Sequence, residues 1–412
     1  MRGTLVGRTW EYDPARYAPP RFRRACHYEA FVPDELSAFD DPFSADLVGV
    51  VSDAESAVHR LNAYARPALA PLARLLLRTE SIASSKVEGM QVDARDLARA
   101  EARLEWGGKA GSTVAEILAN IDAMELAIDH ATGSNAVTLD DLVSIHAALM
   151  ATAPNRHVAG VVRTEQNWIG GNNYNPRGAN FVGPPPQDVP RLLEDLCAAI
   201  NDDVLPPVIQ AGLVHAQFEV IHPFLDGNGR TGRALIHVVL RRRDLTPMYV
   251  PPISVVLAGD KGNYIAGLGA FARGDVEAWL TTFAAATAQS ASLASSYLAR
   301  VGALQDQWRT MLRTAANPRA DSVAWALIDV MPAHPMISVP VAVAATGRTK
   351  AVVNEALLQL EAADVLTRAS PGQRNRTWEA TGLLDLLADL EAGVTLPPPG
   401  AVHDPDSPSR TR

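Results

Sequence analysis

The sequence predicts a mainly α-helical protein, in which a helical bundle is followed by a smaller module of helices and two short strands. Three observations favour this fold class. The chain is rich in alanine, the best helix former. Apolar residues recur at helical spacing in most segments between residues 47 and 290. A single long stretch there, residues 160–186, is too rich in glycine, asparagine and proline to form a helix.

Length and composition narrow the class of protein. With 412 residues the chain is long enough for two or three domains with full cores. Its 47% apolar and 20% charged residues are ordinary for a soluble globular protein. A net charge of −9 argues against a protein that coats nucleic acid through its overall field, although a local basic face stays open. Two distant cysteines, Cys26 and Cys197, predict a reducing compartment and no disulfide framework.

The N-terminal region shows no targeting or membrane signal. It lacks the apolar core of a signal peptide, and no run in the chain reaches the roughly 18 apolar residues of a membrane span. We therefore expect a cytoplasmic protein that does not enter a membrane. Residues 1 to about 45 are rich in proline and aromatic residues, which predicts an extended arm laid over the rest of the protein.

Helices are predicted along most of the following chain. Thr138 should act as an N-cap, and His146 in the helix after it is expected to be structural rather than catalytic. The predicted helices cover residues 47–64, 67–81, 91–135, 142–150, 189–200, 207–220, 231–244 and 275–283.

The stretch at residues 221–233 reads I-H-P-F-L-D-G-N-G-R-T-G-R and concentrates reactive side chains in one turn. Pro223 disfavours helix at His222, so the preceding helix should end there and present the imidazole at its tip. Each feature alone is common: a His-Pro pair usually ends a helix, and G-N-G usually forms a turn. Their combination within a dozen residues points to a functional site.

The charged residues of this stretch predict a site for polyphosphate. Residues 227–229 tolerate positive φ, so that successive N–H groups can point into one concavity. A helix beginning near Arg230 would add its positive end, and Arg230 and Arg233, three residues apart, can each fork onto phosphate oxygens. Asp226 would repel phosphates unless a hard cation lies between them, which predicts a Mg²⁺ ligand. His222 then serves as general base.

The run from His222 to Arg233 resembles the signature of Fic-domain proteins, with every motif position filled. The resemblance implies a Fic-type helical bundle with a short β flap, and transfer of AMP from ATP to a Ser, Thr or Tyr hydroxyl of a target protein. It implies His222 as the base, Phe224 as a core anchor and Asp226 as the Mg²⁺ ligand. The nucleotide-binding residues that it implies are Gly227, Asn228, Gly229, Arg230, Thr231, Gly232, Arg233 and Tyr264. Relatives often carry paired tyrosines near the adenine, and here Asn263 stands in place of the first.

A second motif lies upstream. Glu88 ends a predicted helix, where a carboxylate is mildly unfavourable for the helix dipole, and Gly89 offers a natural helix stop. Ser84-x-x-x-Glu88-Gly89 resembles the inhibitory motif of Fic proteins whose inhibitory helix lies N-terminal to the core. The resemblance implies that Glu88 pairs with Arg233 and blocks the catalytic placement of the γ-phosphate. A bidentate carboxylate would occupy the fork that phosphate needs.

The irregular stretch at residues 160–186 is long enough to be functional. Residues 166–171 could form a short β-ribbon whose free backbone edge accepts an extended segment by strand addition. This ribbon resembles the Fic flap, which positions the target hydroxyl, with Ile169, Gly170 and Gly171 as its docking residues. Trp168 fits equally well as a core anchor.

The C-terminal part predicts a separate module. A long connecting helix (288–313) and a hinge (315–320) precede an order of elements that resembles a winged helix-turn-helix. Such a module can place its second helix in a DNA major groove. The available phosphate contacts are Arg348, Lys350, Arg374 and Arg376. Glu355 and Glu361 add negative charge near these cations, so the electrostatic field of the module is mixed. This favours protein docking or dimerisation over DNA binding. The elements are helices at 323–331, 339–345, 349–362 and 383–390, and strands at 365–368 and 377–379.

The favoured interpretation is a self-inhibited protein adenylyltransferase that uses ATP and Mg²⁺. Two alternatives stay open: removal of AMP at the same site, with Glu88 orienting a water, and a DNA-binding regulator whose Fic site senses nucleotide. A homodimer is suggested by relatives alone. The expected domains are an N-terminal arm and helices (1–105), the Fic core (106–290), the connecting helix and hinge (291–318), the winged module (319–392) and a disordered tail (393–412).

Overall fold

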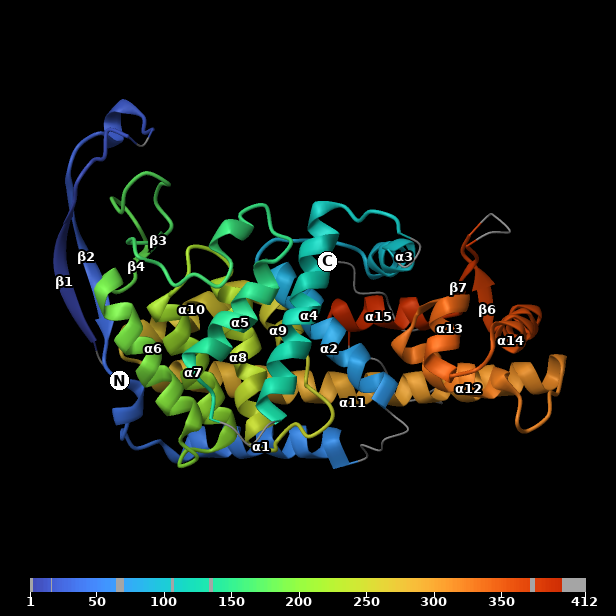
Figure 1. The fold of residues 1–412 in the computed structure, drawn as a ribbon. Helices are drawn as coiled ribbons and strands as arrows, with labels where there is room; N and C mark the ends of the chain where they lie inside the picture. The colour runs from blue at the N-terminus through green and yellow to red at the C-terminus, as the bar shows by residue number, and fades with distance from the viewer. Residues whose placement is uncertain are drawn as a thin grey trace, which may run out of the picture. The chain divides into compact units, whose positions relative to one another are not determined.

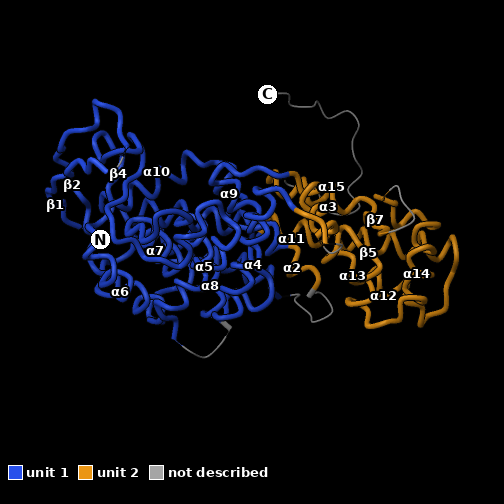
Figure 2. Tube along the Cα trace, turned by 45° about the horizontal axis from the view of Figure 1, so that its top comes forward, with its two compact units in different colours: residues 1–65, 76–92, 110–291 blue, residues 66–75, 93–109, 292–412 orange. Residues whose placement is uncertain are grey.

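The computed structural model describes residues 3–15, 17–63, 70–104, 107–132, 136–370 and 375–394. These residues form a mainly helical protein with small antiparallel sheets, which confirms the predicted fold class (Figure 1). The chain divides into two compact units (Figure 2). Unit 1 contains residues 1–65, 76–92 and 110–291, and unit 2 contains residues 66–75, 93–109 and 292–412. Among the described helices, none combines the length and the apolar character needed to cross a membrane.

Unit 1 is built mostly of helices. Most of its helices overlap segments predicted to be helical, because those segments carry apolar residues at helical spacing. The helices are α1 (Ala45–Ala63), α2 (Ala70–Val87), α4 (Ser112–Thr132), α5 (Leu139–Met150), α6 (Val189–Asn201), α7 (Pro207–Ile221), α8 (Asn228–Arg242), α9 (Ile253–Gly259), α10 (Lys261–Ala272) and α11 (Val276–Ala315), of which α2 and α11 continue into unit 2. Short 3₁₀ helices cover Pro20–Phe22, Leu36–Ala38, Arg156–Val158, Pro186–Asp188 and, in unit 2, Met331–Ala333.

Helix α7 forms the centre of unit 1. Nearly all of its residues are buried, which is expected for a helix that is apolar on all sides. It packs against α8, α6 and α1. Helix α8 in turn packs against α4 and α5. The turn that joins α7 to α8 carries the motif at residues 222–233, so two buried helices fix its position.

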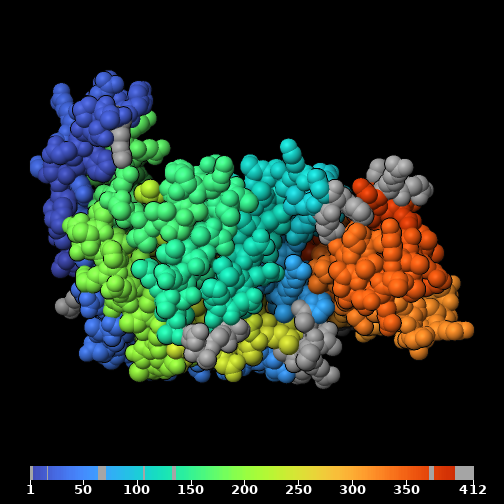
Figure 3. Space-filling model, viewed as in Figure 1, coloured from blue at the N-terminus to red at the C-terminus, as the bar shows by residue number. Residues whose placement is uncertain are grey.

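The N-terminal residues form paired strands rather than a simple extended arm. Strand β1 (Gly3–Trp10) pairs antiparallel with β2 (Cys26–Pro33), in the register Gly3↔Pro33 to Trp10↔Cys26. No residue of β1 is fully buried, so it lacks the alternating apolar pattern that identifies a strand from sequence. Strand β2 contacts β4 (Phe181–Val182), which follows β3 (Trp168–Ile169), and the N-terminal residues in blue lie beside the green residues of this segment in Figure 3.

Unit 2 contains a compact group of helices on a small sheet. Strands β5, β7 and β6 form an antiparallel sheet in that order, and α12, α13 and α14 pack against one another. The elements are α3 (Ala94–Leu104), α12 (Val323–Val330), β5 (Met336–Ser338), α13 (Val339–Thr346), α14 (Lys350–Ala362), β6 (Leu366–Arg368), β7 (Thr377–Ala380) and α15 (Leu383–Glu391). Strand β5 was not predicted, because three residues are too few to show a period.

Several predicted boundaries differ from the structure. The closing helix at 275–283 and the connecting helix at 288–313 are one helix, α11, since the alanines between them continue it. The domain boundary expected at residue 105 does not match the end of either compact unit. Residues 93–109, which include α3, belong to unit 2, and residues 110–291 belong to unit 1. There Arg95 of α3 binds Glu379 (2.9 Å) and Asp385 (3.1 Å). Residues 395–412 of the predicted tail, and Arg374, lie outside the described residues.

The predicted phosphate contacts of unit 2 present a mixed surface. Arg376 is engaged within the unit, because it donates to Asn354 (2.6 Å) and lies over the Trp378 ring. The exposed residues of α14 include Lys350, Val352, Glu355 and Leu358, and Arg348 just before the helix is also exposed. This surface mixes cations with apolar and acidic side chains, so it lacks the consistently positive charge that favours contact with a DNA backbone.

Candidate active site

His222 lies at the C-terminal end of α7, as the sequence predicts. It caps the helix in the left-handed conformation (φ 48°, ψ 59°), and its N–H donates to the Phe218 carbonyl at 2.9 Å. Its ring Nδ1 lies 3.3 Å from the Glu219 carbonyl oxygen. A proton on Nδ1 would donate to that oxygen and leave Nε2 free to accept one. Burial lowers the pKa of His222 to about 4, so the imidazole is neutral at pH 7.

The loop after His222 is held by its own side chains and by His146. Asn228 accepts from the Phe224 N–H (2.9 Å) and donates to the Phe224 carbonyl (2.8 Å). The buried Phe224 ring stacks on His146, with centroids 3.6 Å apart. The Gly160 N–H donates to His146 Nδ1 (2.9 Å), so Nε2 carries the proton and donates to the Asp226 carbonyl at 2.9 Å. His146 therefore has the structural role that the sequence analysis expected.

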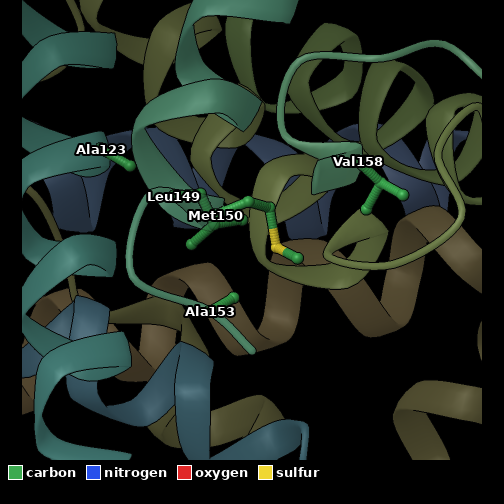
Figure 4. Close-up of a cluster of buried hydrophobic side chains, with 5 residues drawn as sticks. All are labelled: Ala123, Leu149, Met150, Ala153 and Val158. Atoms are coloured by element: carbon green, nitrogen blue, oxygen red, sulfur yellow. The ribbon is translucent and has the colours of Figure 1, made fainter. Parts of the chain in front are cut away.

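An apolar cluster lies beneath this loop. Figure 4 shows its side chains, which come from α4, from α5 and from the segment after α5. Met150 connects the cluster to the motif, because its sulfur lies 3.8 Å from Arg230 Nη2. A Cβ at Gly227 would lie 2.9 Å from the same sulfur, and Gly227 has a φ of +77°, so only glycine fits there. The cluster comprises Ala123, Leu149, Met150, Ala153 and Val158.

Helix α8 begins two residues earlier than predicted. Gly227 is its N-cap, and Asn228 and Gly229 are already helical. Of the three residues expected to tolerate positive φ, only Gly227 adopts it. The anion site is therefore the first turn of a helix, whose N–H groups have no partner within the helix and whose dipole is positive. A cavity of about 310 Å³ opens at this turn and is lined by Glu88, Met90, Glu116, His222, Leu225, Asp226, Gly227, Asn228, Gly229 and Arg230.

Arg230 is a buried cation that forms no salt bridge among the described residues, although the nearby carboxylates of Asp226, Glu88 and Glu116 favour its charged form. Its side chain borders the cavity, and the residue is only 4% exposed. Within the described part of the chain, Nε and Nη1 have no hydrogen-bond partner, and Nη2 reaches only the Met150 sulfur. Leaving a buried guanidinium unpaired is costly. The arrangement therefore favours an anionic ligand in the cavity.

Arg233 contacts the upstream motif. Its Nη2 donates to Glu88 Oε1 (2.8 Å) and to the Ser84 carbonyl (2.8 Å), and its Nε donates to the Ser84 hydroxyl (2.9 Å). The predicted bidentate pair is therefore wrong in detail, because Ser84 takes the second arm of the fork. Burial alone would raise the pKa of Glu88, but Arg233, with Arg230 and Lys261, holds it below its usual value. Glu88 is an anion here.

The Glu88 carboxylate lies directly against the first turn of α8. A Cβ built on Gly229 would lie 2.1 Å from Glu88 Oε1, so Gly229 leaves the space that the carboxylate fills. The site that the helix N-terminus and the arginines create for an anion is thus partly occupied by a side chain of the same chain. About 40% of the Glu88 side chain remains exposed.

Helix α2 is joined to α8 by a row of polar contacts. Glu80, Ser84 and Glu88 are spaced by four residues and share one face of the helical segment. Glu80 Oε1 lies 3.0 Å from His237 Nε2 of α8 and accepts from the Ser254 hydroxyl, while Oε2 accepts from the Ser254 N–H (2.8 Å). Glu80, His237 and Ser254 are fully buried. These contacts hold the last turns of α2 against α8.

Asp226 is exposed at the rim of the cavity, where a carboxylate can reach a cation. Its Oδ2 accepts from Asn155 (2.7 Å) and its Oδ1 from the Gly227 N–H (2.6 Å). Within the described residues, no group of three or more His, Cys, Asp or Glu side chains could hold a metal ion alone. Mg²⁺ is commonly held by one or two carboxylates together with substrate phosphates. A single carboxylate beside an anion site fits that chemistry.

The remaining predicted site residues lie behind the cavity or away from it. Thr231 and Gly232 are buried in α8, and neither lines the cavity. Tyr264 is also buried, and its hydroxyl lies 3.0 Å from His215 Nε2. Burial raises the pKa of Tyr264, so its hydroxyl stays protonated. The structure thus brings together His222 and residues 226–230, and it places Tyr264 in the core of unit 1.

The predicted flap is a short β-ribbon. Strand β3 (Trp168–Ile169) pairs antiparallel with β4, and Ile169 is 43% exposed. Gly170 and Gly171 follow with φ of +78° and +74°, which permits the sharp turn after β3. Trp168 packs edge-on against Trp10 of β1, with ring centroids 5.2 Å apart.

Sequence reasoning missed several residues that contact the motif, and two of them bind its backbone. Arg163 and Asn167, both just before β3, donate to backbone carbonyls of residues 221–224. Their presence in a polar run beside the predicted flap was the one available signal. A contact with a backbone carbonyl leaves no pattern in the side chains of its partner, so the sequence could not reveal it.

Comparison with known proteins agrees with this geometry. Residues 136–240 match the model of the Fic/DOC family. Residues 48–129 match the model described as Fic/DOC family N-terminal. The first match contains the whole motif at 222–233, and the second contains Ser84 and Glu88. Both arginines and the Glu88 carboxylate therefore fall within the matched residues.

Similar proteins carry related names. A protein adenylyltransferase Fic from Nematostella vectensis is 28% identical over 174 residues, which are 41% of this chain and 37% of that protein. Protein adenylyltransferase fic-1 from Caenorhabditis elegans is 29% identical over 118 residues, which are 28% of this chain and 21% of that protein. The chain thus spans well under half the length of these curated relatives. A crystal structure of a Fic family protein from Desulfovibrio desulfuricans G20 shares the fold (TM-score 0.51, 21% identity, 83% of this chain and 98% of that one).

Proposed function

We propose that this chain is a protein adenylyltransferase that moves AMP from ATP to a Ser, Thr or Tyr hydroxyl of a target protein. The observation that carries this proposal is a neutral imidazole and a buried, unpaired guanidinium on one cavity, at the N-terminus of a buried helix. The names of the curated relatives support the same activity. Sensing a nucleotide would require the anion site but would not require the imidazole beside it.

In the proposed reaction, the target hydroxyl attacks the α-phosphorus of ATP. A new O–P bond forms to the hydroxyl oxygen, the bond between the α-phosphorus and the bridging oxygen breaks, and pyrophosphate leaves. Nε2 of His222 takes the hydroxyl proton. Arg230 and the first turn of α8 hold the negative charge of the phosphates. Asp226 would hold Mg²⁺, which when bound neutralises part of that charge.

The same geometry supports self-inhibition by Glu88. Its carboxylate binds Arg233 and fills the space over Gly229, so one arm of this guanidinium is withheld from phosphate. Two anions cannot share this site without strong repulsion. Displacement of Glu88 would free Arg233 for the outer phosphate of ATP and permit its catalytic placement.

Glu88→Gly is expected to raise ATP-dependent self-labelling by about 5- to 150-fold, the usual range for a coupling of 1–3 kcal/mol. The measurement uses ATP labelled at the α-phosphate, with Mg²⁺. Lys86→Gly is the matched control, because it introduces the same flexible residue at an exposed position of the last turn of α2 and leaves the carboxylate in place. Equal labelling by the parent protein and both variants would contradict inhibition by Glu88. Absence of both labelling and ATP binding in all three would contradict the transferase itself.

The pH dependence of this labelling should follow His222. Because burial holds the pKa of the imidazole at about 4, the base stays unprotonated throughout the neutral range. In the Glu88→Gly background, the rate should be nearly constant from pH 8 down to about pH 5 and should fall as the pH passes through about 4. A rate that halves near pH 6.5, the value of an exposed histidine, would show that the base is not the buried imidazole.

We propose that the module in unit 2 docks protein rather than DNA. The mixed surface of α14, where Lys350 lies on the same helix as exposed Val352, Glu355 and Leu358, and the internal engagement of Arg376 support this choice. The proposed chemistry uses no residue of unit 2. The target protein therefore meets His222 through unit 1, where the flap at Ile169, Gly170 and Gly171 offers a backbone edge for strand addition.

A further inference from the structure

Arg163 is a buried arginine whose hydrogen bonds go to backbone carbonyls. It is 2% exposed. Nε donates to the His222 carbonyl (2.8 Å), and Nη2 donates to the carbonyls of Ile221 (3.2 Å) and Pro184 (2.7 Å). Nη1 donates to the Glu165 carbonyl (3.0 Å). Among the residues that the structure describes, no carboxylate lies within salt-bridge distance of it.

The carbonyls of residues 221 and 222 carry the negative end of the α7 dipole. The last carbonyls of a helix lack partners within it, and a cation near them is favourable. His222 adopts a left-handed conformation, which costs free energy for a residue with a Cβ. Arg163 therefore offsets both the unpaired carbonyls and the strained backbone at the residue that carries the imidazole.

Asn167 contacts the same turn from the same segment. Its Nδ2 donates to the His222 carbonyl (2.9 Å) and to the Phe224 carbonyl (3.1 Å). The His222 carbonyl thus accepts from both side chains. The Arg163 N–H also donates to the Pro223 carbonyl at 2.9 Å. Every carbonyl from residue 221 to residue 224 is bound by the segment at residues 163–167.

The same arginine joins the turn to both flanks of the flap. Glu165 precedes β3 and Pro184 follows β4, and the Arg163 guanidinium binds the carbonyls of both. The base and the ribbon proposed to hold the target are thus bound to one planar group with fixed geometry. A lysine could not reproduce this pattern, because a single ammonium cannot span these carbonyls.

We propose that Arg163, assisted by Asn167, is a positioning residue for the transfer reaction: it fixes the backbone of His222 so that its imidazole faces the cavity with Nε2 free, and it sets the flap relative to that imidazole. This inference rests on the proposed function, because it assigns His222 the role of base. Arg163 touches neither nucleotide nor target, and it acts through His222 and the flap.

The test compares Arg163→Gln, Arg163→Lys and Asn167→Ala in the Glu88→Gly background. A small displacement of a reacting group costs about 10²-fold in rate. Both Arg163 variants should therefore lower kcat by about 10- to 100-fold, and Asn167→Ala by up to about 10-fold, with KM and Kd for ATP unchanged. Asn167→Ala removes a half-buried side chain, so it keeps the test valid if the Arg163 variants fold poorly.

Arg243→Gln is the matched control. This arginine also binds backbone carbonyls, those of Leu205 (2.7 Å) and Asp203 (3.1 Å), together with Gln210, and it does not line the cavity. Its replacement should lower thermal stability while kcat stays within about twofold of the parent. If Arg243→Gln lowers kcat as much as Arg163→Gln, or if Arg163→Lys retains full kcat, the positioning role is refuted.

A second readout does not depend on transfer. The ¹⁵N shifts of the His222 ring, assigned by their loss in His222→Ala, report which ring nitrogen carries the proton. The parent should show the proton on Nδ1, and Arg163→Gln should show a mixture of both forms. An unchanged ring in Arg163→Gln would overturn the inference. If the Glu88→Gly parent binds no ATP and labels nothing, the proposed function fails, and the ring shifts still decide the role of Arg163.

Discussion

Replacement of His222 with alanine is expected to lower the rate of AMP transfer by about 10²- to 10⁴-fold, the usual contribution of a positioned general base. Affinity for ATP should change little, because Arg230, Arg233 and the first turn of α8 remain in place. The measurement is self-labelling in the Glu88→Gly background, together with Kd for ATP by calorimetry. Loss of ATP binding in step with labelling would indicate that His222 holds the nucleotide rather than serving as the base.

His146→Asn provides the control for this experiment. His146 is buried nearby, stacks on Phe224 and has a pKa lowered to about 4 by burial, but its Nε2 proton binds the Asp226 carbonyl. Its replacement should lower stability and should retain most of the transfer rate per folded molecule. A transfer rate as low as that of His222→Ala would mean that the loop held by His146 matters to the rate as much as the imidazole of His222 does.

Glu80→Ala is expected to have the largest effect on stability. Removal of Glu80 leaves the buried hydroxyl and N–H of Ser254 without their acceptor, and each buried polar group left unsatisfied costs about 1–3 kcal/mol. His237 Nε2, which lies 3.0 Å from Glu80 Oε1, would also lose its neighbouring carboxylate. Urea denaturation followed by circular dichroism would measure the change in the free energy of unfolding.

Glu116→Ala gives the comparison for this variant. Glu116 is partly exposed on α4 and lines the cavity. Substitutions at such positions usually change stability by no more than about 0.5 kcal/mol. If Glu80→Ala were equally mild, the buried contacts between α2 and α8 would contribute no net stability, and another part of unit 1 would have to hold α2.

Local chemistry made much of the fold and of the motif predictable. Pro223 predicted the end of α7 at His222, and Thr138 forms the predicted cap, as a full capping box with Asp141. The start of α8 was set two residues too late, because glycine and asparagine suggest a turn even where the helix continues. In each of these cases the cause lies within a few residues of the effect.

What the sequence could not predict depends on residues that meet only after folding. Glu80 and His237 are far apart in the chain, and neither belongs to a recognisable motif. Arg163 binds carbonyls, which every residue has, so nothing in its partners distinguishes them. Glu88 contacts Arg233 through a single hydrogen bond, because the Ser84 hydroxyl accepts from Nε of the same guanidinium. A sequence motif gives the identity of Ser84 but not its position in space. Contacts of this kind leave no recognisable pattern in the amino-acid sequence.

The row of contacts between α2 and α8 makes the proposed release of Glu88 a local event. Glu80 and Ser84 are anchored by buried partners, whereas Glu88 comes after the last residue of α2 and is followed by Gly89 with a φ of +84°. The carboxylate can therefore swing away while both helices stay docked. An activating partner would need to favour the swung-out form by only about 1–3 kcal/mol. Release of this kind suits rapid and reversible switching, because neither helix has to unfold before the proposed transfer can begin.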